Sequence, residues 1–421
     1  MHVLDDLTAR GLVYDVTDRE GLAKLLAEGP VTFYCGYDPT AISLHVGNLV
    51  PLGIMRRLAM AGHRMVAVIG GATGMIGDPS GKTTERKLLD KETLVRNQEA
   101  ISAQVKQLVA GNAIVLNNAD WIAPLSLLDF LRDVGKLMTI NYMLAKESVR
   151  ARLEDREHGI SYTEFSYMLL QAFDFTYLAK QHGCRLQIGA SDQWGNITCG
   201  IELCRKMGGP ELFGLVAPLL TDKSGVKFGK SEAGTSVWLD PSLTSPYRFY
   251  QFWVNTEDAN LDRLLKIFTF LPLEEIDRVV REHQEIPSKR IGQRRLAGEV
   301  TTWVHGAEAA RRAQAASEVM FGGSIENLGD ADLEPLLADL PWTQLARAEL
   351  EKGLPLVDLM ARTKLVDSKG AARRLLSQGG VYVNNVRQDD PNRVLWPADL
   401  ATETMVVLRA GKKSYHVLKI L

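Results

Sequence analysis

Over residues 31–220, short runs of β-branched and aromatic residues alternate with longer stretches of helical periodicity. Runs of this kind are typical of buried strands, and their alternation with helices predicts a doubly wound parallel sheet. The expected strands are Val31–Cys35, Met65–Ile69, Ala113–Leu116, Arg185–Ile188 and Leu215–Leu220, with helices such as Leu49–Ala61 and Asn196–Met207 between them. Ligands of such sheets bind at the carboxyl ends of the strands, so we expect a site at that edge.

The strand pattern stops near residue 245. Helical patterns at Leu261–Leu271, Leu273–Glu282 and Ile291–His305 predict a small α-helical domain. The stretch that follows is rich in glycine, proline and acidic residues, which favours a linker. After it come two short helical patterns, a strand pattern and an Asn-Asn turn, which together indicate an α+β domain. The predicted division is an α/β domain at 1–244, an α-helical domain at 245–321, a linker at 322–353 and an α+β domain at 354–421.

Charge is spread unevenly along the chain. The 421 residues have a formal net charge of −2, which argues against a general affinity for nucleic acid. Residues 354–421 contain 11 Lys/Arg against 6 Asp/Glu, an excess of +5, so the rest of the chain has −7. A basic end on an acidic body predicts a local site for a polyanion, although a solvated basic face would give the same count.

Cysteine usage and the N-terminus bear on the compartment. The four cysteines, at positions 35, 184, 199 and 204, form no CxxC pair and no zinc-type spacing, so we expect no metal site and a reduced, cytoplasmic protein. The first residues are acidic and lack a long apolar run, so a signal peptide is not expected. The apolar stretch Met65–Ile76 is broken by glycines and too short to cross a bilayer, so no membrane association is expected.

A glycine-rich loop from Gly70 to Thr83 follows the second expected strand. It is similar to a Walker A loop but fails on spacing, because a GxxxxGK[ST] motif ending at Thr83 needs glycine where the chain has Ile76. A P-loop phosphotransferase is therefore disfavoured. The glycines can still bring backbone close to a ligand, or form a purely structural turn.

Two short segments contain residues suited to a triphosphate. After the first strand, His45-Val46-Gly47-Asn48 places an imidazole, a glycine and an amide at the start of a helix. Far along the chain, Lys227-Phe228-Gly229-Lys230-Ser231 places two lysines three residues apart on a glycine-containing loop. Helix N-termini and lysines of this kind hold phosphates and stabilise the charge that develops as pyrophosphate leaves.

One expected helix has an unusual polar face. Ser161 and Glu164 have the spacing of a capping box, which marks its start. Tyr167, Gln171 and Asp174 then fall at i, i+4 and i+7, so they share one face. These three residues could be a solvated surface, but the apolar residues around them predict burial. A buried Asp174 would need a hydrogen-bond donor as its partner.

The segment Ser191-Asp192-Gln193 lies between an expected strand and an expected helix. Asp192 could accept hydrogen bonds from the hydroxyls of a ribose, as acidic residues do at nucleotide sites. Asp192 or Ser191 could equally cap the helix, which is the commoner use of such residues.

Together these segments resemble the bacterial tyrosyl-tRNA synthetases, which are class I aminoacyl-tRNA synthetases. HVGN and KFGKS correspond to the HIGH and KMSKS signatures of that class, and the likeness extends over essentially the full chain. The other matching pieces are Tyr34–Thr40, Gly77–Lys82, Tyr167–Asp174 and Ser191–Asn196. The YxxxQxxD spacing is the most discriminating, because it separates the tyrosine enzymes from their tryptophan relatives. The resemblance implies a Rossmann-like, HUP-type catalytic domain, a helical domain on the anticodon side and an S4-like RNA-binding domain.

The resemblance also implies roles for particular residues. Tyrosine would be bound by Tyr34, Asp78, Tyr167, Gln171, Asp174 and Gln193. ATP would be bound by Cys35, Gly36, Asp38, His45, Gly47, Asn48, Asp192 and Lys230. Catalysis would rest on Thr40, His45, Lys82, Arg86, Lys227, Lys230 and Ser231. Two positions depart from the usual pattern: Ala190 replaces a glycine near the ribose, which leaves a looser backbone approach, and Asn48 replaces the last histidine of HIGH.

The implied reaction is attack of the tyrosine carboxylate on the α-phosphorus of ATP, which forms tyrosyl-adenylate and releases pyrophosphate. Because the nucleophile is already an anion, no general base is needed, and catalysis comes from positioning and charge stabilisation. ATP is a substrate, Mg²⁺ accompanies its triphosphate, and no tightly bound cofactor is expected. In the second step, the 3′-terminal ribose of tRNA(Tyr) takes the tyrosyl group.

Two partners follow from the resemblance. The basic C-terminal residues expected to contact tRNA phosphates are Lys369, Arg373, Arg374, Lys412 and Lys413. A homodimer is also implied, with its interface around Trp121–Met143. A tryptophan-specific ligase and a catalytically silent RNA-binding paralogue remain as alternatives, although Tyr34 and Asp174 suit a hydroxyl better than an indole.

Overall fold

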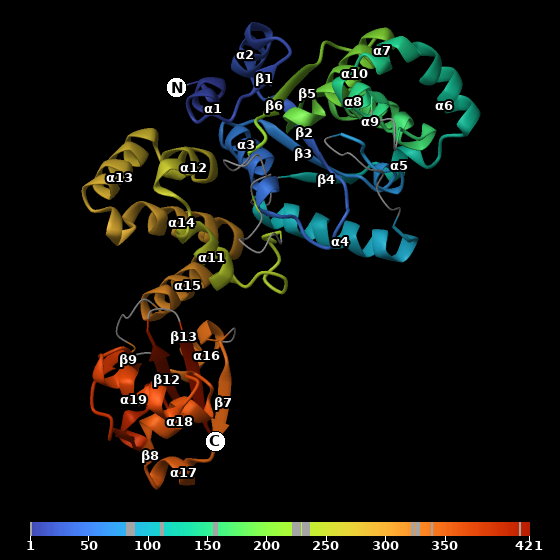
Figure 1. Cartoon of the computed structure of the whole chain (residues 1–421). Helices are drawn as coiled ribbons and strands as arrows, with labels where there is room; N and C mark the ends of the chain where they lie inside the picture. The colour runs from blue at the N-terminus through green and yellow to red at the C-terminus, as the bar shows by residue number, and fades with distance from the viewer. Residues whose placement is uncertain are drawn as a thin grey trace. The chain divides into compact units, whose positions relative to one another are not determined.

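The structure is a computed structural model that describes residues 2–80, 89–109, 113–154, 159–220, 229, 236–320, 325, 329–337, 340–411 and 414–421. The chain forms two compact units. The first unit consists of Met1–Ser245 with Asn255–Leu296, and the second of Pro246–Val254 with Ala297–Leu421. Figure 1 labels most of the helices and strands of both units.

The first unit contains a six-stranded sheet with the strand order β1-β6-β5-β2-β3-β4. Its strands are β1 (Asp15–Val16), β2 (Thr32–Tyr37), β3 (Arg64–Ile69), β4 (Ile114–Asn117), β5 (Cys184–Ala190) and β6 (Phe213–Ala217). Neighbouring strands are parallel except for the two-residue edge strand β1, which is antiparallel to β6. The strand order reverses between β2 and β5, so their carboxyl ends form the topological switch point at which such sheets bind ligands.

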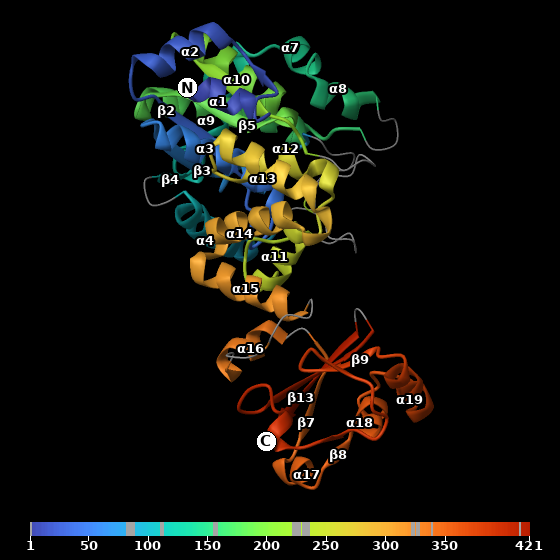
Figure 2. The same ribbon diagram turned by 90° about the vertical axis from the view of Figure 1, so that its left-hand side faces the viewer.

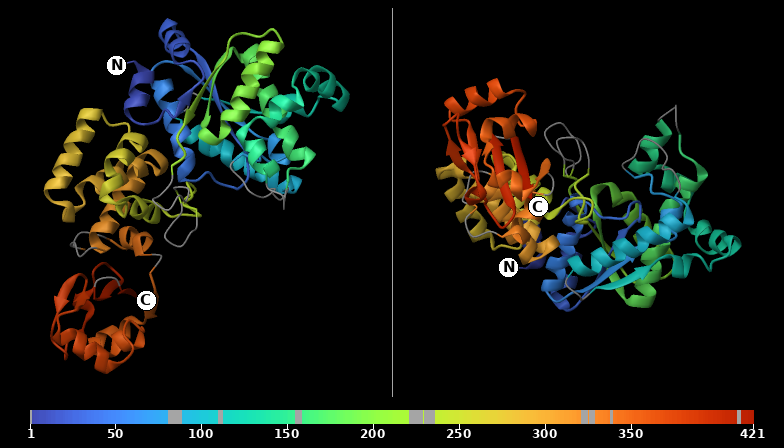
Figure 3. Two further views of the ribbon diagram at one scale, coloured as in Figure 1. Left: turned by 45° about the horizontal axis from the view of Figure 1, so that its top comes forward. Right: turned by 90° about the horizontal axis from the view of Figure 1, so that it is seen from below.

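Helices cover both faces of this sheet. The helices of this part are α1 (Val3–Ala9), α2 (Arg19–Glu28), α3 (Leu49–Met60), α4 (Lys91–Leu108), α5 (Ala119–Ile122), α6 (Leu127–Asp133), α7 (Ile140–Leu144), α8 (Glu147–Glu154), α9 (Tyr162–His182) and α10 (Trp194–Lys206). Helices α3 and α4 pack on one face, and α9 with α10 on the other (Figures 1 and 3). Right-handed crossovers that leave the switch point in opposite directions give this arrangement. The expected doubly wound α/β fold is therefore confirmed.

Helix α9 is fixed firmly at both ends. The Ser161 side chain accepts a hydrogen bond from the Glu164 N–H at 3.2 Å, and Gly183, at a φ of 61°, ends the helix in the left-handed conformation. The Glu164 carboxylate accepts two hydrogen bonds from the Arg152 guanidinium of α8, at 3.0 and 2.9 Å, inside the protein. The first turn of α9 is thus anchored to α8, which fixes the direction of its polar face.

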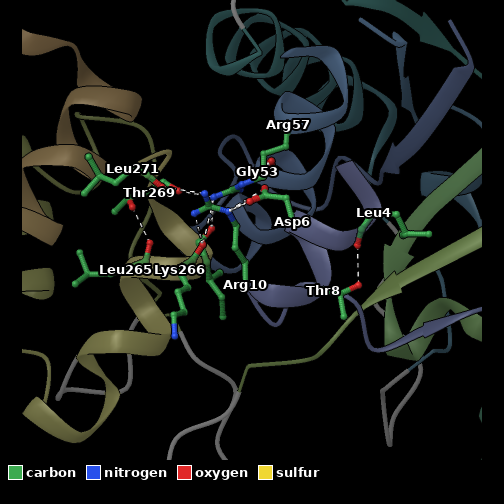
Figure 4. A network of polar contacts seen from close by, with 11 residues as sticks. Leu4, Asp6, Thr8, Arg10, Gly53, Arg57, Leu265, Lys266, Thr269 and Leu271 are labelled. Carbon is green, nitrogen blue, oxygen red and sulfur yellow. Dashed lines mark hydrogen bonds and ion pairs between the residues drawn. The ribbon is translucent and has the colours of Figure 1, made fainter. Parts of the chain in front are cut away.

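A second anchor joins helix α3 to the helices near residue 270, α12 (Leu261–Phe268) and α13 (Leu273–Glu285) (Figure 4). The buried guanidinium of Arg57 donates to the carbonyls of Ile267 and Thr269 at the end of α12, and to its own helix at Gly53. Arg10 pairs with Asp6 at 2.9 Å and donates to the Leu271 carbonyl at 2.9 Å. Cations at the C-terminal carbonyls of a helix satisfy orphan acceptors and complement the helix dipole. This network holds α12 against α3.

The second unit combines helices with a five-stranded sheet of order β10-β9-β12-β13-β7 and a two-stranded sheet of β11 and β8. Its strands are β7 (Trp342–Leu345), β8 (Leu354–Pro355), β9 (Val381–Val383), β10 (Val386–Gln388), β11 (Val394–Leu395), β12 (Met405–Ala410) and β13 (Ser414–Ile420). Its helices are α11 (Pro246–Val254), most of α14 (Ile291–His305), α15 (Ala307–Met320), α16 (Asp330–Leu337), α17 (Arg347–Glu351), α18 (Leu356–Arg362) and α19 (Lys369–Ser377). Helices α18 and α19 form one hydrophobic core with the five-stranded sheet, and α15 and α16 form a second core with strands of the same sheet. Figure 2 shows these helices and strands.

The described part of residues 322–353 differs from the linker that its composition suggests. It contains α16, β7 and α17, and β7 pairs in parallel with β13, with Trp342 opposite Val417 and Leu345 opposite Ile420. Local composition does not reveal this strand, because its partner lies more than seventy residues further along the chain. The expected four-part division stays a prediction.

Candidate active site

One cavity of about 410 Å³ opens at the carboxyl ends of β2 and β5 in the first unit. It gathers every residue proposed for tyrosine, ATP or catalysis that lies in the described part of the chain. These lining residues are Tyr34, Cys35, Gly36, Asp38, Thr40, His45, Gly47, Asn48, Asp78, Tyr167, Gln171, Asp174, Asp192 and Gln193. The fold thus brings together segments that are far apart in the sequence, although the role of each residue stays a prediction.

Asp174 of α9 lies at the buried end of the cavity, with only 4% of its surface exposed. Its carboxylate accepts a hydrogen bond from Asn118 Nδ2 at 3.0 Å and another from the indole Nε1 of Trp121 at 2.7 Å. The expected donor partners therefore exist. Burial raises the pKa of Asp174 to about 7, although the two donors oppose the shift.

Tyr34 of β2 lies beside this carboxylate. Its ring is buried and packs edge-on against Phe175 at 5.2 Å between centroids. Its hydroxyl has no hydrogen-bond partner among the described residues, and burial followed by the charge of Asp174 raises the pKa of the phenol. Buried hydroxyls are rarely left unpaired, so this group is available to a partner inside the cavity. A ligand hydroxyl between Tyr34 and Asp174 could accept from one and donate to the other.

A chain of hydrogen bonds leads from Asp174 toward the middle of the cavity. Asn118 Nδ2 also donates to Thr73 Oγ1 at 3.0 Å, and this hydroxyl donates to Asp38 Oδ1 at 2.9 Å. The Tyr167 hydroxyl donates to the other oxygen of Asp38, also at 2.9 Å. Burial and the charges of Asp38 and Asp78 raise the pKa of Tyr167, so it remains a neutral donor.

Asp78 anchors a second cluster at the amide-rich side of the cavity. It accepts hydrogen bonds from the Ser80 N–H at 2.9 Å and from Gln193 Nε2 at 2.7 Å. The amides of Gln171, Gln193 and Asn196 bond to one another at 3.1–3.2 Å. Four carboxylates, from Asp38, Asp78, Asp174 and Asp192, line this cavity, whose described walls include no Lys or Arg. Such a region favours a cationic group such as an ammonium.

The opposite end of the cavity is formed by backbone. His45 Nδ1 accepts a hydrogen bond from the Gly47 N–H at 3.0 Å, and Asn48 Oδ1 accepts from the His45 N–H at 3.0 Å. These two bonds cap the short helix Val46–Asn48, which continues into α3. Because Nδ1 is the acceptor, the proton of a neutral imidazole lies on Nε2. A helix N-terminus with an N–H donor beside it is suited to phosphate.

The family comparisons agree with this geometry. Residues 26–322 match the family model of tRNA synthetases class I (W and Y), and residues 332–418 match the tyrosine–tRNA ligase SYY-like C-terminal domain. A tyrosine–tRNA ligase of Roseiflexus castenholzii is 50% identical over 425 residues, with 100% of this chain and 99% of that protein covered. The tyrosine–tRNA ligase of Geobacillus stearothermophilus is 49% identical over 431 residues, with 100% of both covered. The chain belongs to the tyrosine–tRNA ligase family.

Solved structures support the same assignment. A C-terminally truncated mitochondrial tyrosyl-tRNA synthetase of Coccidioides posadasii has a TM-score of 0.67 and 34% identity, and covers 75% of this chain and 91% of that one. A tryptophanyl-tRNA synthetase of Encephalitozoon cuniculi, at 15% identity and a TM-score of 0.55, shares the fold alone and covers 79% of this chain and 90% of that one. The predicted fold class and tyrosine–tRNA ligase function are confirmed.

The lysine-bearing signature segment is represented in the structure by one residue. Lys82, Arg86, Lys227, Lys230 and Ser231 lie outside the described residues. Gly229 of KFGKS is described, at a φ of 105°, and its carbonyl accepts from the Val237 N–H at 2.8 Å. A Cβ on Gly229 would lie 3.4 Å from the Gly47 nitrogen. The two signature segments, distant in sequence, therefore meet at this glycine.

The alternative use of Asp192 as a helix cap is not observed. Asp192 lies within the short helix Ser191–Gln193, and neither this helix nor α10 has a side-chain cap. Ala190, the departure from the family pattern, lines the cavity just before it.

Sequence patterns missed several residues of the site. Thr73, Asn118, Trp121, Asn196 and Trp238 lie in the cavity wall or bond to its carboxylates. Asn118 could have been found, because it directly follows the strand β4 and so reaches the ligand-binding edge of the sheet. No sequence pattern marks Trp121 as a site residue, because its role in the site comes from a hydrogen bond to Asp174, 53 residues away.

The proposed tRNA contacts lie in the second unit. Lys369, Arg373 and Arg374 belong to α19, whose N-cap is Ser368, while Lys412 and Lys413 lie outside the described residues. The two arginines are exposed, whereas Lys369 Nζ pairs with Asp358 at 2.8 Å. The arginines are therefore better placed than Lys369 to bind phosphate.

Proposed function

We propose that this chain performs its family's reaction in two steps, through tyrosyl-adenylate, with tyrosine bound at the buried end of the cavity and ATP at the His45 end. The observation that supports this most strongly is the orphan Tyr34 hydroxyl beside the Asp174 carboxylate. That pair offers a donor and an acceptor to one phenolic hydroxyl, and an indole has no oxygen to use both.

The cavity wall also suits the other groups of tyrosine. Its ammonium would lie among Asp78, Gln171 and Tyr167, where carboxylates concentrate without a lysine or arginine in the described wall. Its carboxylate would lie near Gln193, toward the mouth of the cavity. Held at both ends, the amino acid presents an anionic nucleophile in a fixed direction, which is the main catalytic contribution of positioning.

ATP would bind as its Mg²⁺ complex along the segment that starts α3. The ribose would contact Cys35, Asn48 and Asp192, and the γ-phosphate would face Thr40 and His45. The helix dipole at this start favours the negative charge of the phosphates, and the lysines of KFGKS would stabilise pyrophosphate as it leaves. Among the residues that the structure covers, no group of three His, Cys, Asp or Glu could hold a metal ion.

We further propose that tRNA(Tyr) binds to the α19 surface and that two copies of the chain form a dimer. The predicted interface, around Trp121–Met143, includes α6, which has no buried residue. Leu127 and Leu128 of this helix are 70% and 77% exposed, and Ile140 is 58% exposed. Exposed apolar patches of this kind mark contact surfaces.

The four buried cysteines are all unpaired thiols, as suits a cytoplasmic protein. No helix in the described ranges is long and apolar enough to span a membrane.

The test is ATP–pyrophosphate exchange with tyrosine, with tryptophan and without amino acid. Tyrosine alone should support exchange, and subsequent addition of tRNA(Tyr) should give tyrosyl-tRNA. Exchange with tryptophan at a comparable rate would refute the assignment of the hydroxyl slot, and an absence of any exchange would refute the two-step reaction.

A further inference from the structure

The segment after the KFGKS signature lies against the HVGN segment like a short strand. Val46 N–H donates to the Val237 carbonyl at 3.0 Å, and Leu239 N–H donates to the Leu44 carbonyl at 2.9 Å. These bonds make His45 and Trp238 antiparallel partners. Val237 and Leu239 are buried, and the alternation of side chains along the segment directs Trp238 to the other side, into the cavity wall.

The two side chains of this pair also meet. The imidazole of His45 and the indole of Trp238 lie 6.3 Å apart between centroids, at 62° to each other. This is the edge-on arrangement that aromatic rings prefer. The imidazole is therefore held at two points, by the Gly47 N–H at Nδ1 and by the indole along its side. Together they restrict the two side-chain torsions of His45 and so fix the direction of its ring.

The backbone around Trp238 is itself well supported. The Trp238 N–H donates to Thr244 Oγ1 at 3.0 Å, and the Asp240 N–H donates to Ser43 Oγ at 3.1 Å. The indole is thus presented by a segment tied on both sides to residues 43–46. A ring held this way can position a neighbour without rearranging itself.

We propose that Trp238 is a positioning residue for the activation step, which holds the His45 imidazole so that its Nε2–H points at the triphosphate of ATP. It would act through His45 and not on tyrosine, because its ring lies at the phosphate end of the cavity. The inference rests on the proposed role of His45 at the γ-phosphate. Loss of the indole should slow adenylate formation by roughly tenfold, the upper range for one aromatic pair.

A double-mutant cycle on the full chain tests this coupling. The measured quantity is the single-turnover rate of tyrosyl-adenylate formation at saturating tyrosine. Trp238→Ala should slow it by roughly tenfold, whereas in a His45→Ala background the same change should cost less than about twofold. The dissociation constant of tyrosine should not change. Leu243→Ala, an exposed side chain on the same segment, serves as the matched control and should behave as the parent.

Two further variants guard against a folding defect. Trp238→Phe keeps a ring beside His45 and should retain most of the rate, whereas Trp238→Leu keeps bulk without a ring and should resemble Trp238→Ala. Equal rates for the Phe and Leu variants would overturn the proposal. So would an equal loss from Trp238→Ala with and without His45, which would mean that the indole contacts ATP directly or merely supports the loop. If the parent shows no tyrosine-dependent activation at all, the proposed function itself fails, which is a separate result.

Discussion

The two ends of the cavity hold their polar groups in different ways. At the end proposed for tyrosine, Asp174 is fixed by Asn118 and Trp121, side chains from other elements that lie 56 and 53 residues away. At the end proposed for phosphate, the His45 ring and the Asn48 amide are fixed mainly by backbone N–H groups within three residues, and Trp238 adds one ring contact from a distant segment. The first end therefore depends on tertiary packing, and the second mainly on the local geometry at the start of one helix.

The two ends of the cavity also differ in their electrostatics. The tyrosine end buries a carboxylate whose pKa rises to about 7, so keeping an ionised acceptor there costs folding stability. The phosphate end offers backbone dipoles, which need no buried charge. Removal of the buried carboxylate should accordingly have a larger and more selective effect than any single substitution at the phosphate end.

The largest effect should come from Asp174→Ala. This change removes the charged acceptor and leaves the donors of Asn118 and Trp121 unpaired in a buried site. Tyrosine affinity should fall by about 10²-fold, the upper range for one lost charge-assisted hydrogen bond. Equilibrium dialysis with labelled tyrosine measures it, and the ATP dissociation constant is the internal control. A loss below tenfold would show that Asp174 does not bind the substrate.

The next effect is a pH dependence. In the proposed binding mode, the Asp174 carboxyl would accept the substrate hydroxyl only when ionised, and its pKa in the free protein is about 7. Tyrosine should therefore bind best above that pH, and its dissociation constant should rise by roughly 30-fold between pH 8 and pH 5.5. Titration calorimetry across this range measures the dependence. ATP binding in the absence of tyrosine should lack this profile.

The same shift has the opposite sign for folding. In the unfolded chain the carboxyl ionises near its ordinary pKa of 3.8, whereas the folded protein retains the proton up to about 7. This group therefore lowers the free energy of unfolding as pH rises from about 4 to about 7. Compared with Asp174→Asn, the parent should lose urea resistance over that interval. A constant difference between the two would contradict the raised pKa.

The contrast between the ends also explains what can be predicted from sequence. The HVGN segment is recognisable because its contacts are local, and spacing alone places an imidazole and an amide at a helix start. Helical periodicity predicts that Tyr167, Gln171 and Asp174 share one face of α9. The apolar residues around Asp174 predict its burial, which the structure shows. Trp121 and Trp238 cannot be found this way. Each matters through a partner distant in the chain, which only the folded sheet brings near.

The strands of the fold can likewise be divided into those that the sequence predicts and those that it does not. The alternating pattern over residues 31–220 predicts the sheet, because most of its parallel strands contain a short apolar run. The edge strands escape this reasoning. Asp15–Val16 is two residues long, and Trp342–Leu345 pairs with the last strand of the chain. Strands this short contain too few residues for a periodic pattern to be recognised in the sequence, and their register is set by the strand with which they pair.

A smaller effect is expected at the phosphate end. Asn48→Ala removes the amide that accepts the His45 N–H, one of the two bonds that cap this helix start. Loss of a cap of this kind costs about 1 kcal/mol, so the KM for ATP should rise by about five- to tenfold. Tyrosine affinity should stay within twofold of the parent. Asn48→His is the matched control, because a ring nitrogen can accept the same N–H and should keep the KM near that of the parent. An unchanged KM in Asn48→Ala would show that this cap does not shape the phosphate site.

The smallest expected change in affinity tests the hydroxyl slot most directly. Tyr34→Phe removes a neutral donor whose hydroxyl has no described protein partner, so the fold loses no internal hydrogen bond. Tyrosine should then bind about two- to fivefold more weakly, the size of one neutral hydrogen bond. Equilibrium dialysis measures this change, with the ATP dissociation constant again as the internal control.

The same variant should change specificity, because the parent pocket penalises phenylalanine for leaving the Tyr34 hydroxyl unpaired. In Tyr34→Phe that penalty is gone, so activation of phenylalanine should improve or stay equal. Asp174 would still favour tyrosine, which is why the preference should shrink without vanishing. The ratio of kcat/KM for tyrosine and phenylalanine in pyrophosphate exchange measures this. A ratio unchanged from the parent would mean that the substrate hydroxyl does not lie between Tyr34 and Asp174, and the orphan hydroxyl of Tyr34 would then need another occupant.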